Sequence, residues 1–169
     1  MGPQLTGGMI VVRESSGSGY LRYPTIAGET IVFVAEDDLW ITTIHGGVAR
    51  RLTTSLSRAS LPCLSPDGSQ IAFVAGDDGP QELYVMPAEG GPPTKLTHLG
   101  AATVTSGWHP DGSILFTTDA ESPFAGWRFP YRIAPTGGMP EPLPWGPAQR
   151  VAVDVGGGIV LNRNGQDPA

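Results

Sequence analysis

Residues 64–75 read Leu64-Ser65-Pro66-Asp67-Gly68-Ser69-Gln70-Ile71-Ala72-Phe73-Val74-Ala75, a Ser-Pro-Asp-Gly turn that leads directly into an apolar run. Pro66 fixes φ near −65° at the start of the turn and Gly68 accepts a positive φ, so the chain is expected to reverse here between two strands. The same turn returns as His109-Pro110-Asp111-Gly112. A hairpin that recurs in this way predicts a repeated β unit.

The apolar run that follows the turn recurs at intervals of 40, 43 and 45 residues. Its copies begin at Ile31, Ile71, Ile114 and Ile159. Each of the first three is followed by a second apolar-aromatic run, then by a Gly-Gly pair and a leucine. The second runs are Leu39–Ile41, Leu83–Val85 and Tyr131–Ile133, the glycine pairs are 46–47, 90–91 and 137–138, and the leucines are Leu52, Leu96 and Leu143. Four landmarks in a constant order indicate an internal repeat.

A repeat of about 40 to 47 residues with four short antiparallel strands has the size of a β-propeller blade. A β-sandwich is the alternative, because it also has short strands joined by turns, but it gives no reason for one turn to return at a fixed period. We therefore expect an all-β chain with propeller blades at 20–57, 58–101 and 102–147 and the first part of a fourth at 148–169. Residues 1–19, rich in Gly and Ser, are expected to be a flexible lead-in.

Three blades and part of a fourth do not complete a propeller, since rings typically close with four to eight blades. The sequence therefore predicts an incomplete ring, and with it a fragment of a longer protein. The 24 glycines and 17 prolines among 169 residues fit this arrangement and exclude a helical bundle.

Composition excludes several other classes of function. A net charge of −6 argues against binding to nucleic acid or to an anionic membrane surface. The longest apolar run, residues 31–35, is far too short for a membrane helix, and no signal peptide is visible, so a cytoplasmic location is expected. The single Cys63 cannot form an internal disulfide, and we expect neither a metal site nor a cofactor.

The sequence shows no catalytic motif. No serine has the glycines of a Gly-x-Ser-x-Gly nucleophile elbow, and the three histidines, His45, His98 and His109, are spaced too widely for a metalloprotease helix. We therefore expect no catalytic residue within these 169 positions.

Acidic residues follow the second strand of each expected blade and so share the period. They are Asp37, Asp38, Asp77, Asp78, Asp119 and Glu121, and we call them the acidic arc. Because equivalent loops of successive blades lie on one rim, these carboxylates are expected to surround one mouth of the propeller channel. Aspartate is also a good hairpin residue, which is the simpler interpretation. The alternative is that the arc selects peptides by charge or docks a basic neighbour.

Three segments carry a resemblance to a known family. Tyr20-Leu21-Arg22-Tyr23-Pro24-Thr25-Ile26, Glu36-Asp37-Asp38-Leu39-Trp40 and Gly46-Gly47-Val48-Ala49-Arg50-Arg51-Leu52-Thr53 resemble the opening of the tricorn peptidase family. The resemblance covers residues 20–169. The Ser-Pro-Asp-Gly turn alone is less specific, because it is shared with TolB-like proteins and with the propellers of prolyl-oligopeptidase-like enzymes.

The resemblance implies a large cytoplasmic serine peptidase that degrades short peptides downstream of the proteasome and assembles as a homo-hexamer. Its chain would begin with a six-bladed propeller that serves as a passage for peptides, and its remaining propeller and catalytic domains would lie beyond residue 169. Whether this chain has enzymatic activity of its own is left open. The alternative function is a TolB-like or WD40-like module that binds a partner protein and catalyses nothing.

Overall fold

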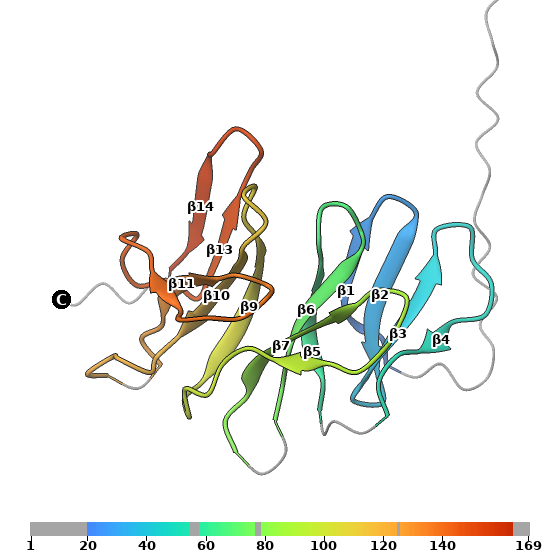
Figure 1. Cartoon of the computed structure of the whole chain (residues 1–169), viewed down its shortest axis with the longest axis horizontal. Coiled ribbons are helices and arrows are strands. Elements are labelled where there is room, and N and C mark those ends of the chain that lie inside the picture. The colour runs from blue at the N-terminus through green and yellow to red at the C-terminus, as the bar shows by residue number, and fades with distance from the viewer. Residues whose placement is uncertain (1–19, 55–57, 77–78, 125, 164–169) are drawn as a thin grey trace, which may run out of the picture.

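The computed structural model describes residues 20–54, 58–76, 79–124 and 126–163; the expected lead-in at 1–19 lies outside them. These residues form strands and turns and no helix, in four separate antiparallel sheets (Figure 1). The expectation of an all-β chain built from propeller blades in an open ring is confirmed.

Three sheets have four strands and the last has two, and in each the strand order follows the chain. The first contains β1 (Arg22–Ala27), β2 (Thr30–Ala35), β3 (Asp38–Thr43) and β4 (Arg50–Arg51). The second contains β5 (Ser60–Leu64), β6 (Gln70–Ala75), β7 (Glu82–Pro87) and β8 (Thr94–Lys95). The third contains β9 (Thr103–Trp108), β10 (Ile114–Thr118), β11 (Phe129–Ile133) and β12 (Glu141–Pro142), and the fourth β13 (Arg150–Val153) and β14 (Ile159–Asn162).

The first strands of successive sheets, β1, β5, β9 and β13, lie next to one another, whereas the two-residue fourth strands lie at the outside. Side chains cross between the sheets along this inner row. Thr25 Oγ1 accepts a hydrogen bond from the backbone N–H of Leu64 at 3.2 Å, and the indole N–H of Trp108 donates to the carbonyl of Cys63 at 3.0 Å. The first strands therefore form a row on the side of the open ring that faces the propeller axis.

The apolar core lies between the sheets. One cluster joins β2 and β3 to β6, and a second joins β6 and β7 to β10 and β11. Phe73 and Phe116 hold equivalent places in the second and third sheets. Both are 0% exposed, and each stacks on the tyrosine of the next strand with ring centroids 5.7 Å apart. Phe33 has the same place in the first sheet but is only half-buried, because none of the four described sheets packs on that face.

The inner strands of the first two sheets carry a bulge opposite Phe33 and Phe73. Tyr23 and Pro24 together oppose Phe33, and Leu61 and Pro62 oppose Phe73. Tyr23 and Leu61 have positive φ angles of 52° and 51°, the left-handed conformation that a bulge residue adopts. Proline suits the next position because it needs no partner for a backbone N–H. The bulges change the direction of the side chains at the start of β1 and β5.

In each of the first two sheets, a buried threonine hydroxyl bridges a backbone N–H and a carboxylate of the third strand, an arrangement that we call the threonine clamp. In the second sheet the hydroxyl of Thr97 accepts the N–H of Leu83 at 2.9 Å and donates to the carboxylate of Glu82 at 2.6 Å. Burial alone would raise the pKa of Glu82, but the hydrogen bonds from Thr97 and from the backbone of Gly100 outweigh it and lower the pKa. The first sheet repeats the arrangement with Thr53, Leu39 and Asp38.

In the third sheet, other residue types occupy all three positions of the threonine clamp. The N–H of Leu143 donates to the carbonyl of Pro130, as Leu52 does to Leu39 and Leu96 to Leu83, which places Pro130 at the clamped position. Proline has no N–H to satisfy, so a threonine is not needed, and Pro144 and Phe129 occupy the threonine and acid positions. The weaker third repeat in the sequence thus has a physical explanation.

We predict that Thr97→Val destabilises the chain by about 1–2 kcal/mol, because the buried N–H of Leu83 and carboxylate of Glu82 lose their shared partner while the side-chain volume hardly changes. Urea unfolding of the full chain measures this. Thr94→Val, on the exposed strand β8, is the matched control. An equal loss of stability in the two variants would contradict the clamp.

Candidate functional site

The turn between β2 and β3 presents the first members of the acidic arc. Glu36 and Asp37 are its two central residues, and both have positive φ angles, 51° and 62°, as in the two-residue hairpin turns that match strand twist. Asp37 forms an ion pair with Arg22 at 2.7 Å, and its carbonyl accepts the N–H of Ala59 from the second sheet at 2.9 Å. Asp37 is therefore exposed at the rim and partly neutralised.

Asp38 differs from the expectation of a free rim carboxylate. It begins β3 and is only 5% exposed. One oxygen accepts the hydroxyl of Thr53 at 2.7 Å, and the other is paired with the guanidinium of Arg51. Its place is inside the threonine clamp, so the carboxylate holds the first sheet together.

The third sheet contributes Asp119 and Glu121 to the same rim. Asp119 accepts the N–H of Ala102 at 2.9 Å and that of Gly126 at 3.1 Å, and Glu121 accepts the hydroxyl of Tyr131 at 3.0 Å. Asp77 and Asp78 lie outside the described residues. Every described member of the arc thus has a local partner, and a role in selecting peptides stays a prediction.

A cavity of about 490 Å³ opens on this rim, between the first and second sheets. Its lining comes from the starts of β1 and β5, the β2–β3 turn and the residue before β7. We call it the rim cavity. Its lining residues are Arg22, Tyr23, Asp37, Arg58, Ala59, Ser60, Leu61 and Gln81. The repeat gives no indication of Arg22 and Arg58, because neither arginine recurs at the same place in the other blades. No signal in the sequence places them together, since they meet only where β1 and β5 lie side by side.

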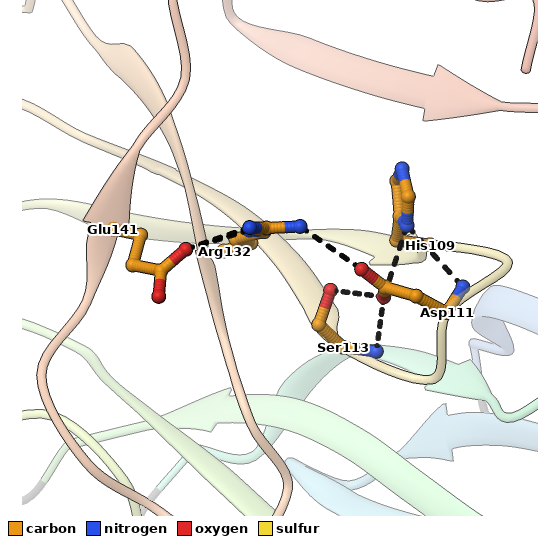
Figure 2. Close-up of polar contacts among 5 residues, drawn as sticks. All are labelled: His109, Asp111, Ser113, Arg132 and Glu141. Carbon is orange, nitrogen blue, oxygen red and sulfur yellow. Dashed lines mark hydrogen bonds and ion pairs between the residues drawn. The ribbon is translucent and has the colours of Figure 1, made fainter.

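The opposite rim carries a polar cluster on the third sheet, at the Pro-Asp-Gly turn between β9 and β10 (Figure 2). Arg132 lies between two carboxylates, 2.9 Å from Asp111 and 2.8 Å from Glu141. His109 Nδ1 is 2.9 Å from Asp111, and the hydroxyl of Ser113 also donates to Asp111, at 2.6 Å. Because Ser113 donates to the carboxylate and not to the imidazole, the cluster has no activated nucleophile. It stabilises the turn and fixes Arg132.

Other candidate chemistry receives no support from the described residues. They contain no group of His, Cys, Asp and Glu that could hold a metal ion. Cys63 is half-buried, and burial raises the pKa of its thiol to about 11, so little thiolate is present near neutral pH. No helix in the described ranges is long and apolar enough to cross a membrane.

The four sheets, each a meander with its first strand at the axis, define the class of protein as a β-propeller. Residues 18–169 match the family model of the tricorn protease N-terminal beta propeller domain, and the chain belongs to this family. A tricorn protease homolog of Streptomyces coelicolor (homolog 1) is 35% identical over 142 residues, a match that covers 83% of this chain and 13% of that protein.

Solved structures agree with this assignment. The crystal structure of the tricorn protease superposes with a TM-score of 0.74 at 29% identity, over 80% of this chain and 14% of that one. TolB from Acinetobacter baumannii superposes with a TM-score of 0.68 at 21% identity, over 88% of this chain and 39% of that one, which supports the fold alone. The chain thus spans about one seventh of the length of these two tricorn proteins.

In each of the two Pro-Asp-Gly turns, hydrogen bonds are expected to lower the pKa of the aspartate carboxyl group. Hydrogen bonds from Ser65 and from the backbone and hydroxyl of Ser69 lower the pKa of Asp67 to about 2, and bonds from Ser113 and His109 lower that of Asp111 to about 2. Since each folded-state pKa lies below its ordinary value of 3.8, the stabilisation is complete above pH about 4 and is lost as the pH falls through about 2.

Carboxyl NMR titration of the chain measures both values. Ser65→Ala is expected to raise the pKa of Asp67 toward its ordinary value and to leave that of Asp111 unchanged. If Asp67 titrates near 3.8 in the unmodified chain, the turn does not hold its carboxylate as described.

Proposed function

We propose that this chain is the N-terminal propeller of a tricorn-like serine peptidase, and that its axial channel is a route by which short peptides reach or leave the active site. The match to the tricorn propeller family over residues 18–169 is the observation that carries the proposal. In this proposal the peptidase acts on short peptides downstream of the proteasome, in the cytoplasm and as a homo-hexamer. No residue of this chain is proposed to be catalytic, and no cofactor is required.

The position of the rim cavity beside the inner strands supports a role in access. The first strands of the sheets lie side by side around the axis, and the rim cavity opens beside the starts of β1 and β5. Arginine, glutamine and serine side chains line it, so the polar backbone of a peptide finds hydrogen-bond partners there. The remaining propeller and catalytic domains of the proposed peptidase would supply the chemistry.

A second candidate function is a binding module without enzymatic activity. TolB shares the fold, so the fold by itself does not distinguish this function from the peptidase. The two proposals differ in whether peptide hydrolysis by the protein that contains this chain depends on the channel mouth.

Blocking the mouth tests the access route. In a Cys63→Ser background, Ser60→Cys places one reactive thiol in the rim cavity, and a bulky maleimide attached there is expected to slow peptide hydrolysis by the whole peptidase several-fold. Labelling of the active-site serine by a small phosphonate measures whether the catalytic site itself is intact.

The control is Thr94→Cys in the same background, which carries the same label on the exposed strand β8. Label at position 94 should leave hydrolysis unchanged. If label at position 60 is equally harmless, peptides do not use this mouth.

A further inference from the structure

The loop between β10 and β11 presents two aromatic side chains that the core does not use. It runs from residue 119 to residue 128, whereas the equivalent turn of the first sheet contains only residues 36 and 37. Phe124 and Trp127, which are 63% and 45% exposed, contact each other with ring centroids 5.9 Å apart and a tilt of 54°. Neither ring belongs to the two apolar clusters of the described core. An exposed aromatic pair of this kind is a candidate binding surface.

Hydrogen bonds hold this loop in one conformation. The backbone N–H of Trp127 donates to the carbonyl of Phe124 at 3.2 Å. Asp119 accepts the N–H of Gly126 at 3.1 Å, and the side-chain amide of Gln149, just before β13, donates to the carbonyl of Gly126 at 3.1 Å. The aromatic pair is therefore arranged before a ligand arrives, which lowers the entropy that binding costs.

The same loop carries a carboxylate that is oriented but only half used. The hydroxyl of Tyr131 donates to one oxygen of Glu121 at 3.0 Å, and Tyr131 itself is buried and stacked on Phe116. Burial, with the Glu121 carboxylate as the second cause, raises the pKa of Tyr131, so its hydroxyl stays protonated and keeps donating at neutral pH. The second oxygen of Glu121 has no hydrogen bond or ion pair within the described ranges, and the residue is exposed.

The charges of the loop favour a cationic ligand. Asp119 and Glu121 outnumber Arg128, whose Nε is buried and whose guanidinium donates to the side chain of Gln149. The loop thus has a net charge of −1, and its one cationic side chain is bound to the neighbouring segment.

These features specify the ligand further. A guanidinium group is planar, stacks on the face of tryptophan and donates to a carboxylate at the same time, whereas an ammonium group has no plane to stack. A neutral apolar side chain would make no use of the free oxygen of Glu121. We propose that this loop binds an arginine side chain of a peptide, with Trp127 and Phe124 as the stacking surface and Glu121 as the hydrogen-bond acceptor.

This proposal deepens the access role and rests on it for the identity of the ligand as a peptide. It also divides the acidic arc by function. Glu121 would contact the ligand, whereas Asp119 holds the loop that carries the aromatic pair.

The test is an NMR titration of the ¹⁵N-labelled chain with four acetyl- and amide-capped tripeptides. Their central residues are arginine, lysine, leucine and citrulline, which has the shape of arginine without the charge. We expect the arginine peptide to shift the indole N–H signal of Trp127 and the amide signal of Gly126. The lysine peptide should bind more weakly, and the leucine and citrulline peptides should leave both signals in place.

Two variants separate the stacking surface from the carboxylate. Trp127→Leu is expected to weaken binding of the arginine peptide about threefold, as for an exposed contact between a cation and an aromatic ring; the amide signal of Gly126 reports it. Glu121→Gln keeps an acceptor for Tyr131, and it is expected to weaken binding about threefold and to remove most of its dependence on salt.

The matched controls lie on other sheets. Tyr20→Leu removes an aromatic side chain that is 82% exposed, and Glu89→Gln removes an exposed carboxylate from the second sheet. Both should leave binding unchanged. Unchanged amide signals in the first two sheets verify that the Trp127 and Glu121 variants are folded.

The proposal is overturned if the citrulline or leucine peptide shifts the same signals as much as the arginine peptide does, if the lysine peptide binds as tightly, or if Trp127→Leu behaves like Tyr20→Leu. Because binding is measured without hydrolysis, its failure is distinct from failure of the access role. Binding of the arginine peptide with no effect of the label at position 60 would retain the arginine site and remove the access role.

Discussion

Each four-stranded sheet has two apolar faces and can bury them only against neighbouring sheets. This packing requirement organises the whole chain. It buries Phe73 and Phe116 completely, leaves the equivalent Phe33 half-exposed, and forces the first strands into a row around an axis. The rim cavity is a by-product of that row, because Arg22 and Arg58, which are far apart in the sequence, line one cavity only where β1 and β5 are neighbours.

The repeat made the fold predictable from the sequence. Landmarks such as Ser65-Pro66-Asp67-Gly68 and the pair of Phe73 and Tyr84 are local and periodic, so both the strands and their order could be inferred. The inner bulges could not, because Pro24 and Pro62 signal an unpaired N–H without showing which residue lies opposite. Thr53 and Thr97 directly follow two of the repeated leucines, but their role depends on carboxylates 15 residues away along the chain, which only the sheet brings into contact.

The candidate site was predicted less completely, for the opposite reason. Periodicity directs attention to Asp37 and Asp119, which recur, and these carboxylates have turned out to have structural partners within the rim. Arg58 has no counterpart at the same place in the other repeats.

The threonine clamp has a consequence for how such blades diverge. In the second sheet, changing Thr97 or Glu82 alone leaves a buried polar group without its partner, so these two side chains and the N–H of Leu83 are constrained as a set. In the third sheet these three positions are occupied by Phe129, Pro130 and Pro144, which bring neither a polar side chain nor an N–H of residue 130 that needs a hydrogen-bond partner. The order in which such substitutions arise therefore matters: a proline at the clamped position removes the backbone N–H that needs the threonine, and the threonine and the acid then remain bound to each other, so that they are best replaced together.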